Sequence, residues 1–525
     1  MREGTQRRLP YWPVAGALVA VGAGLRVWHW AYGRGLWGDE LYVAHNLRER
    51  GFVDLLYPLA YSQSAPPGWL WLERFALAVS GPGEQSLRLV PLLFGLALLP
   101  LVAYLGYRLL PKVAALAALL LVAVSPFLIS YSNQVKQYSA EAFWVTLLVG
   151  VGILVHRSAH RLRYLVFWGA ATAGATMSAL AIPVSAVLAT ILVVGLVVDR
   201  AAGAARWREM ARFAVPAPLW LGVVAAVYVW NLRPTRNDTA LRDYWLRKQV
   251  YPYRDLTDLP ATFDWLHSTY KSLAVVPFAL WAPALFLVLL VVGAVVCWRR
   301  SGWLTVAMLL TPLAIGLGAG ALGQYPMTER LALYCVPSCL LLSAFAVSPP
   351  TGQIVLGWSR LTAGAALVGV VLVPQVVTDI RAAADPQRAY KQGGGANLAD
   401  YRGALRYLSE QWREGDLVLA TPVSWNGQSY YGPPADGYVR LAEAGACPGE
   451  TASGLLSGRS RVWVFQATDW DEDDNAEINA RLGQGGALSE RSFVGARVVR
   501  VDLTDGAAAG AGLCLVSPPR SAAVR

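Results

Sequence analysis

The feature of this sequence that most constrains its fold is a series of long stretches with few or no charged side chains. An α-helix needs about 20 apolar residues to cross the hydrocarbon core of a bilayer. Stretches of suitable length occur at roughly 11–30, 87–107, 113–131, 139–155, 164–198, 213–232, 272–297, 302–322, 331–348 and 361–378. With 55% hydrophobic and only 15% charged residues over 525 positions, the composition predicts a polytopic α-helical membrane protein.

The number of spans depends on the stretch 164–198, which is too long for one ordinary span and short for two. Gly174 and Pro183 lie near its middle, where they favour a break into two helices. With two helices, every Arg and Lys cluster in the short connections falls on one side of the membrane. A single helix would place residues 200–212 on the other side. Because basic residues concentrate in cytoplasmic loops, we predict about eleven spans and a cytoplasmic N-terminus.

The polar connections predict a transmembrane domain over residues 1–380 with two large outer loops. Under this topology, loops 31–86 and 233–271 face the extracytoplasmic side. In the first loop, the apolar stripe of 39–50 and the helix-start prolines of 66–80 predict two helices lying in the membrane interface.

Residues 381–525 predict a small extracytoplasmic α/β domain, because helical patterns alternate there with apolar, β-branched runs. The expected helices are 401–412 and 474–484, and the expected strands are 417–420, 461–467 and 496–503. Cys447 and Cys514 are the only cysteines in this part of the chain. Outside the cytoplasm they could form a disulfide.

The net charge of +11 raises the question of an acidic partner. Much of the arginine lies in short connections between apolar stretches. Topology-setting charge and contact with anionic membrane lipids explain that placement better than nucleic-acid binding does. The predicted partners therefore include membrane lipids and no nucleic acid.

The pair Asp39–Glu40 directly follows the first apolar stretch. An acidic side chain there is costly unless it faces water, pairs with a cation or acts on a substrate. Adjacent side chains at a helix start point in different directions, so one can act as a general base while the other pairs or caps. The alternative is a helix cap or interfacial ion pair with no chemistry. Two adjacent carboxylates can also hold one divalent metal ion, although no third ligand is evident, and no other cofactor is indicated.

A second polar cluster lies in the segment Tyr131–Tyr138, between two apolar stretches. Its Lys136 can bind a phosphate as a point charge. The alternative is a lysine that contacts lipid headgroups.

A third cluster precedes the stretch 331–348, where Arg330 can clamp a phosphate through two N–H groups. The alternative is an arginine paired with Glu329. In the loop 233–271, Tyr244 and Trp245 lie among arginines, which is typical of an interfacial anchoring belt and also fits a lid over a lipid-phosphate site.

Four motifs, in this order and spacing, resemble the bacterial protein O-mannosyltransferase and aminoarabinose-transferase branch of the C-type (GT-C) glycosyltransferase superfamily. They are WGDELY after the first stretch, APPGWLWL in the first loop, SPFLISYSNQVKQYSAEAF at 125–143 and QYPMTERLALYCVP at 324–337. The resemblance covers about residues 10–380, and the tail resembles the soluble domain of many such proteins. It implies a multi-pass protein of a bacterial cell membrane that transfers a sugar from a polyprenyl phosphate on the extracytoplasmic face, with inversion.

The resemblance also implies roles for individual residues. Asp39 matches the family's catalytic base with Glu40 as its neighbour, and Lys136, Arg330 and Tyr138 are expected at the donor phosphate. The expected substrate contacts are Tyr131, Gln134, Glu141, Tyr325, Tyr244 and Trp245. The chain departs from the family where Gln134 replaces a frequent glutamate, although Glu141 can supply a carboxylate nearby.

These observations together predict a membrane glycosyltransferase whose acceptor is a lipid, a polysaccharide or a protein. Two alternatives remain. The first is a lipid or solute transporter or flippase, which predicts helix-breaking or charged residues at mid-bilayer depth in repeated halves. The second is a non-catalytic relative that binds an envelope polymer, which the replacement at Gln134 keeps open.

Overall fold

A computed structural model describes residues 10–198, 205–236, 258–347, 373–381, 383–384, 399–421, 424–432, 438–442, 451–468 and 472–516. The chain forms two compact units. The helical unit contains residues 1–32 and 47–394, and the sheet unit contains residues 33–46 and 395–525. A helical membrane unit and a small α/β unit confirm the predicted fold class. The division differs from the predicted domains in two respects: residues 33–46 of the first loop belong to the sheet unit, and the boundary lies after residue 394 instead of residue 380.

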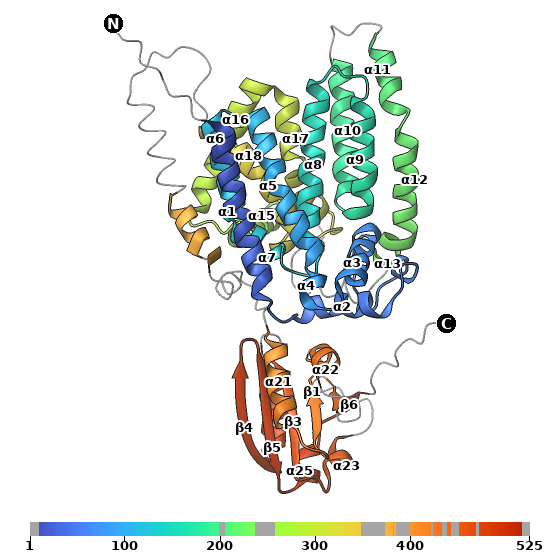
Figure 1. Ribbon diagram of the computed structural model, residues 1–525, viewed down its shortest axis with the longest axis vertical. Coiled ribbons are helices and arrows are strands. Elements are labelled where there is room, and N and C mark those ends of the chain that lie inside the picture. Colours follow the sequence, from blue (N-terminus) through green and yellow to red (C-terminus); the bar gives the residue numbers. More distant parts are fainter. Residues whose placement is uncertain are drawn as a thin grey trace. The chain divides into compact units, whose positions relative to one another are not determined.

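The helical unit consists of long helices that run side by side (Figure 1). Its α-helices are α1 (Tyr11–Tyr32), α3 (Pro67–Ser80), α4 (Glu84–Leu87), α5 (Leu89–Leu109), α6 (Lys112–Val124), α7 (Pro126–Tyr131), α8 (Tyr138–Arg157), α9 (Arg163–Met177), α10 (Ala181–Val198), α11 (Ala205–Ala214), α12 (Ala217–Val227), α13 (Arg233–Arg236), α15 (Leu259–Val275), α16 (Pro283–Ser301), α17 (Trp303–Ala321) and α18 (Val336–Ala344). Shorter turns are η1 (Asp54–Leu56), η3 (Tyr228–Leu232), η4 (Glu329–Cys335) and η5 (Phe345–Val347). Helix α2 (Gly38–Glu49) begins in the sheet unit and ends in the helical unit.

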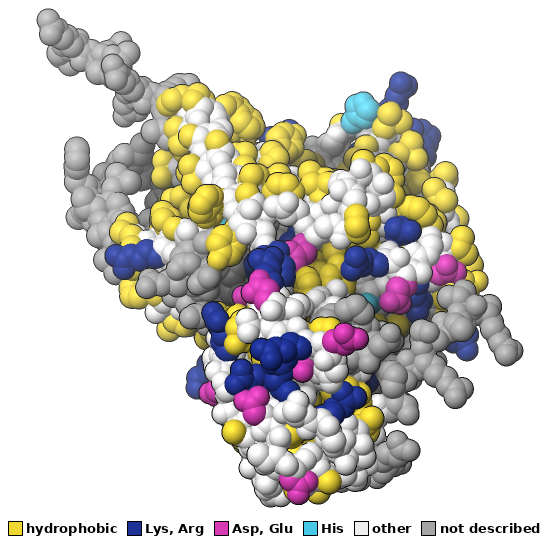
Figure 2. Space-filling view, turned by 60° about the horizontal axis from the view of Figure 1, so that its bottom comes forward, with side chains coloured by type: hydrophobic (Ala, Val, Ile, Leu, Met, Phe, Trp, Pro, Cys, Tyr) yellow, Lys and Arg dark blue, Asp and Glu magenta, His cyan; other side chains and the backbone are white. Residues whose placement is uncertain are grey.

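Eight helical segments among the described residues are long and apolar enough to cross a bilayer. Their outward side chains are also apolar: on α16, Val288, Val291 and Val295 are all exposed. Figure 2 shows hydrophobic side chains over much of the upper part of the view. So much uncovered apolar surface is expected when lipid is the solvent. The predicted eleven spans stay a prediction, because residues 348–372 lie outside the described part.

The stretch 164–198 forms two helices, as predicted. Helix α9 ends at Met177 and α10 begins at Ala181, and the Ser178 hydroxyl accepts the N–H of Ala181 at 3.3 Å. Pro183 lies in the first turn of α10, where its missing N–H removes no helix hydrogen bond. The break therefore lies just before the proline.

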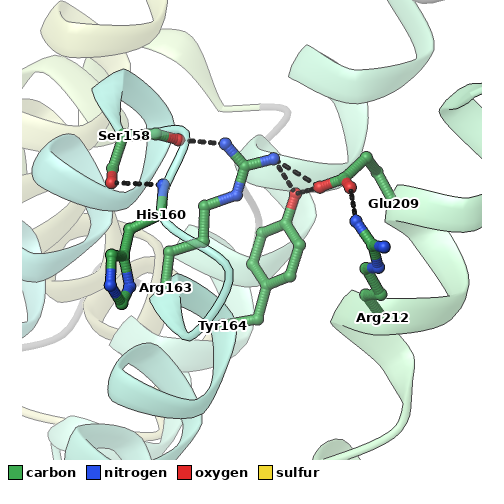
Figure 3. Close-up of polar contacts among 6 residues, drawn as sticks. All are labelled: Ser158, His160, Arg163, Tyr164, Glu209 and Arg212. Atoms are coloured by element: carbon green, nitrogen blue, oxygen red, sulfur yellow. Dashed lines mark hydrogen bonds and ion pairs between the residues drawn. The ribbon is translucent and has the colours of Figure 1, made fainter.

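A polar network joins two basic clusters at one end of the helical unit (Figure 3). Arg163 and Tyr164 both donate to Oε2 of Glu209, at 2.5 and 3.0 Å. Arg212 donates to Oε1 of the same carboxylate at 2.7 Å. These arginines come from the two clusters that flank 164–198. If 164–198 forms two helices, the two clusters lie at the same end of the unit, and their contact with one carboxylate agrees with this. The cytoplasmic orientation of this end stays a prediction.

The first loop contains the two predicted helices, α2 and α3. Helix α3 begins at Pro67 and is apolar on both its buried and its exposed face. It buries Trp69 and Leu70, and it leaves Trp71 and Phe75 exposed. A short helix with one apolar exposed face suits the interface between water and lipid.

The sheet unit is built on six strands in the order β4-β5-β3-β1-β2-β6. The strands are β1 (Leu417–Ala420), β2 (Tyr438–Leu441), β3 (Arg461–Ala467), β4 (Gly486–Phe493), β5 (Ala496–Leu503) and β6 (Leu515–Val516). The accompanying helices are α21 (Tyr401–Gln411), α22 (Trp425–Tyr431), α23 (Ser453–Leu456), α24 (Glu472–Leu482) and α25 (Gly506–Gly510). Strand β1 is parallel to β2 and β3, and the other pairs are antiparallel.

Three strands of this sheet were not predicted from the sequence, namely β2, β4 and β6. Strand β4 pairs with β5 along its whole length, yet its side chains are exposed or half-buried on both faces. Such a strand has no alternation of apolar and polar residues to detect. The predicted strands β1, β3 and β5, whose buried valines and leucines form the core, are confirmed.

A buried ion pair joins the start of β1 to β3. Asp416 accepts hydrogen bonds from Arg461 at 2.5 and 2.9 Å and from the Trp463 indole at 2.9 Å. Burial by itself raises the pKa of Asp416, but the hydrogen bonds from Arg461 and Trp463 outweigh burial and hold that pKa below its ordinary value of 3.8.

Asp416→Asn is expected to lower the free energy of unfolding of the sheet unit by roughly 1–3 kcal/mol, because Arg461 loses its charged acceptor. A carboxylate with a depressed pKa stabilises the folded state above its ordinary pKa, and this stabilisation is lost as the pH falls through the folded-state value. Thermal unfolding from acid to neutral pH should therefore show a weaker acid dependence in the variant. Glu410→Gln, at an exposed position on α21, is the control. Equal acid dependence in wild type and Asp416→Asn would contradict this account.

Candidate functional site

The two carboxylates of the acidic pair, at the start of α2, have different surroundings. Glu40 is fully buried, and its Oε2 lies 2.9 Å from Nη1 of Arg34 and accepts the N–H of Trp37 at 3.4 Å. Trp37 directly precedes the helix, so Glu40 closes the first turn as the acidic residue of a capping box does. Asp39 is only half-buried. Glu40 therefore serves the local structure, and Asp39 is the better candidate to meet a substrate.

Lys136 lies in the tight segment between α7 and α8, and residues of the first loop hold this segment. Its Nζ donates to Oε1 of Gln63 at 2.7 Å, and the next residue, Gln137, donates to the carbonyl of Ser64 at 3.4 Å. Lys136 is only 6% exposed. This hydrogen bond orients the ammonium group.

Arg330, in η4, is joined to the start of α8. Its Nε donates to the hydroxyl of Tyr138 at 3.2 Å, while its Nη1 lies 3.7 Å from the carboxylate of Glu329. The ring of Tyr131 packs edge-on against Tyr138, with centroids 5.5 Å apart. Since Tyr138 follows Lys136 by two residues, the predicted donor-phosphate residues share one neighbourhood.

The remaining predicted substrate contacts of this unit lie on these elements or in the connections next to them. Gln134 is buried and donates to the Ser130 hydroxyl at 3.3 Å, but its Oε1 has no hydrogen-bond partner among the described residues. Glu141 is buried in the first turn of α8. The hydroxyl of Tyr325 donates to the carbonyl of Leu331 at 2.9 Å. This bond fixes the turn that carries η4, so it gives Tyr325 a structural role.

Strained backbone occurs in the loops that hold the two cations. Apart from glycine, positive φ angles among the described residues occur at Tyr61 (64°), Ser62 (50°), Ala279 (50°) and Glu329 (42°). Two of these directly precede Gln63, and another directly precedes Arg330. Such conformations cost about 1–3 kcal/mol each and are often found at ligand-binding sites.

An apolar cavity lies in the helical unit beside α6, α16 and α18. Its lining includes Leu121, Phe278, Trp281, Phe286, Leu289 and Leu340. Its few polar groups include Gln375, which donates to the Asp379 carboxylate at 2.8 Å. The lining also includes Val336, the residue that follows η4. Such a lining suits a hydrocarbon chain.

Several predicted residues cannot be placed in this site. Tyr244 and Trp245 lie outside the described residues. Cys514 is disulfide-bonded, while Cys447 lies outside the described part, so their pairing stays a prediction. Within the described ranges, no group of three or more His, Cys, Asp and Glu side chains could hold a metal ion. The divalent ion at Asp39 and Glu40 stays a prediction as well.

Comparison with known proteins supports the membrane architecture. Residues 64–230 match the family model described as dolichyl-phosphate-mannose-protein mannosyltransferase, and no curated protein matches the sequence. The chain is similar to the crystal structure of ArnT from Cupriavidus metallidurans bound to undecaprenyl phosphate, with 14% identity and a TM-score of 0.50 over 94% of this chain and 99% of that chain. The apo state of ArnT from Cupriavidus metallidurans has the same identity and coverage, with a TM-score of 0.48. The chain has the fold of ArnT.

This fold is the one that the resemblance of the four motifs implied. The segment that matches the family model includes Lys136 and Tyr138. Asp39 and Arg330 lie outside that segment. Their proposed roles therefore depend on the motifs and on the geometry of their own surroundings.

Two residues that were not singled out in the sequence help to shape the cation site. Gln63 is the acceptor of Lys136. Arg26, fully buried in α1, donates to backbone carbonyls that include Ala123 O at 3.0 Å, in the last turn of α6. A helix C-terminus attracts a cation. The carbonyl of Arg26 in turn accepts from Asn133 at 3.3 Å, so this arginine helps to hold the segment that leads to Lys136.

Glu73, on α3, is a buried acid that was also not singled out. Its side chain is fully buried, and both carboxylate oxygens lack a hydrogen-bond partner among the described residues. Burial raises the pKa of Glu73 well above its ordinary value of 4.5.

Glu73→Gln is expected to stabilise the protein at neutral pH. An acid whose folded-state pKa is raised favours folding most below 4.5. Above that pH, each further pH unit up to the folded-state pKa lowers the free energy of unfolding by about 1.4 kcal/mol. The thermal midpoint in detergent should therefore fall from acid to neutral pH more steeply in wild type than in the variant. Glu84→Gln, at a half-exposed position, is the control. Equal steepness in the variant and in wild type would contradict the raised pKa of Glu73.

Proposed function

We propose that this protein is a membrane glycosyltransferase that moves a sugar from a polyprenyl phosphate to an acceptor on the extracytoplasmic face. The donor class is supported by two likenesses. The matching family model is named for dolichyl-phosphate-mannose, and the similar ArnT structure was solved with undecaprenyl phosphate. Both compounds join a long prenyl chain to a phosphate. The acceptor is a lipid, a polysaccharide or a protein.

The observation that carries this proposal is the way in which two cations near the start of α8 are held. Lys136 is oriented by the neutral amide of Gln63, and Arg330 by the neutral hydroxyl of Tyr138. Arg330 also lies 3.7 Å from the Glu329 carboxylate. Both cations lie beside the start of α8, where we place the donor phosphate.

The apolar cavity suits the other part of such a donor. Its lining of leucine, phenylalanine and tryptophan side chains can receive a segment of the prenyl chain. The lining residue Val336 directly follows η4, the segment that carries Arg330. We propose that the chain of the donor enters this cavity while its phosphate meets Lys136 and Arg330.

The transfer step follows from the chemistry of the donor. The acceptor hydroxyl or amine gives a proton to the Asp39 carboxylate, and its oxygen or nitrogen forms a bond to the anomeric carbon. The bond from that carbon to the phosphate oxygen breaks, and the electron pair leaves with the polyprenyl phosphate. A single in-line displacement inverts the anomeric configuration. Glu40 holds the first turn of α2 through Arg34 and Trp37, so we assign it a positioning role.

Sugar transfer from a donor panel tests this proposal. The full-length protein in proteoliposomes would be given labelled polyprenyl phosphates that carry different hexoses and pentoses, together with envelope material as the acceptor source. We expect one donor to be consumed, with release of polyprenyl phosphate and transfer of label to the acceptor fraction. Movement of intact donor across the bilayer without loss of sugar would instead identify a flippase. Binding of envelope material without consumption of any donor would identify a non-catalytic binding protein.

A further inference from the structure

The segment that carries the acidic pair is held by the C-terminal part of the chain. Residues 33–46 belong to the same compact unit as residues 395–525, although more than three hundred residues separate them in sequence. The segment enters this unit after α1 and includes the first turns of α2. Its contacts with the sheet unit lie on both sides of Asp39.

The first set of contacts precedes the acidic pair. Arg402, at the start of α21, donates to the carbonyl of Gly33 at 2.7 Å. The hydroxyl of Tyr431, the last residue of α22, accepts the N–H of Leu36 at 2.8 Å. A Cβ added at Gly35 would lie 3.1 Å from the Cβ of Arg402, so the backbone of the segment approaches α21 closely. The chain is thus held just before α2 begins.

The second set of contacts follows the acidic pair. Nε2 of His45 lies 3.1 Å from the Ser429 hydroxyl and 3.4 Å from the carbonyl of Asn426, both on α22. The ring of Tyr430 meets the imidazole edge-on, with centroids 5.4 Å apart. His45 is buried. One short helix, α22, therefore contacts the segment on both sides of the acidic pair.

Between these contacts, the segment is braced internally. Arg34 pairs with the buried Glu40 at 2.9 Å, and Glu40 accepts the N–H of Trp37. These bonds fix the first turn of α2, on which Asp39 stands. The direction of the Asp39 carboxylate then depends on a backbone whose two ends are tied to α21 and α22.

We infer that the sheet unit is part of the catalytic machinery, in which Arg402, Tyr431 and Ser429 are positioning residues for Asp39. This inference rests on the proposed function, and it adds a role for a domain to which no activity is otherwise assigned. A general base must lie within hydrogen-bond reach of the proton that it accepts. A displacement of about 1 Å can cost about 100-fold in rate. Loss of the α22 contacts should therefore lower kcat.

The alternative is that these contacts only stabilise the fold of the sheet unit. The two accounts differ in what loss of a contact changes. If the contacts position Asp39, kcat falls and the KM for the donor stays constant, because the proposed phosphate ligands Lys136 and Arg330 belong to the helical unit. If the contacts are only structural, thermal stability falls and the turnover of the folded protein does not change.

The test uses the full-length protein in proteoliposomes and the variant Tyr431→Phe/Ser429→Ala, which removes two hydroxyl groups and no bulk. Hydrogen–deuterium exchange is followed at residues 33–46, where the amide of Leu36 is the direct reporter. Turnover is measured with the donor that wild type consumes. Ser453→Ala is the matched control, because its hydroxyl bonds to Ala507 elsewhere in the same unit. Tyr431→Phe/Ser429→Thr restores one hydroxyl.

We expect faster exchange over residues 33–46, unchanged exchange in β1, β3 and β5, and a kcat that is lower by about 10- to 100-fold. Partial recovery is expected in the threonine variant. Unchanged exchange would overturn the claim that α22 holds the segment. Faster exchange with wild-type kcat would overturn the positioning role. A further outcome is that wild type transfers no sugar from any donor while the double variant still exchanges faster at Leu36. That result would contradict the proposed function and would leave the contact between α22 and the segment supported.

Discussion

Replacing Asp39 with Asn is expected to lower the rate of sugar transfer by about 10²- to 10⁴-fold and to leave donor binding unchanged. The amide keeps the size of the carboxylate but cannot take the proton of the acceptor. Glu40 cannot take over this role, because its carboxylate is buried against Arg34. The measurement is the initial rate of polyprenyl-phosphate release in proteoliposomes, together with equilibrium binding of the labelled donor.

Two variants on the same helix separate chemistry from structure. Glu49→Gln, at the exposed end of α2, should transfer sugar at the wild-type rate. Glu40→Gln should lower the thermal midpoint together with the rate, because it weakens the contacts with Arg34 and Trp37. Wild-type transfer by Asp39→Asn would exclude Asp39 as the base. Loss of donor binding in that variant would place Asp39 in recognition of the donor.

The membrane helices and three strands were predictable because their signal is local. A membrane span is recognised from about 20 consecutive apolar residues. The break between α9 and α10 was predicted from the charge clusters at 157–163 and 200–212. Strands β1, β3 and β5 carry buried β-branched runs. Strand β4 carries mostly exposed side chains. It is held by backbone pairing with β5, which no pattern within its own residues reveals.

The candidate site was predictable by residue type but not by contact. The clusters around Asp39, Lys136 and Arg330 were found because charged groups beside apolar stretches are costly and therefore informative. The pairing of Arg330 with Glu329 was considered, but the contacts of Lys136 with Gln63 and of Arg330 with Tyr138 were not predicted, since they span 73 and 192 residues.

The grouping of residues 33–46 with the sheet unit could not have been read from the sequence either. It depends on contacts such as Leu36 to Tyr431, across 395 residues. Neither residue lies in an unusual sequence pattern. Leu36 takes part through its backbone amide in a short connection, and Tyr431 is one of 23 tyrosines. Long-range pairings of this kind are decided by the whole fold. Motif reasoning therefore found the acidic pair and the C-terminal domain, but not the contacts between them.

Removing either cation of the proposed donor site should have the second large effect. Lys136→Met and Arg330→Met are each expected to lower kcat by about 10²- to 10³-fold. A sugar-linked polyprenyl phosphate is a diester with one negative charge. The departing polyprenyl phosphate is a monoester that develops a second charge, so a nearby cation stabilises the transition state more than the bound donor. Single-turnover rates at saturating donor measure this difference, because they separate the chemical step from binding.

Variants that keep the charge decide between a catalytic cation and a lipid contact. Lys136→Arg and Arg330→Lys should retain more activity than the methionine variants, and Tyr138→Phe should have an intermediate effect, since it removes only the hydroxyl that orients Arg330. Arg108→Met is the control, because this exposed arginine, at the end of α5, bonds to Tyr104. Methionine variants with wild-type single-turnover rates would contradict the donor-phosphate assignment. Lys136 would then be a contact for lipid headgroups, the alternative that its place between two apolar stretches leaves open.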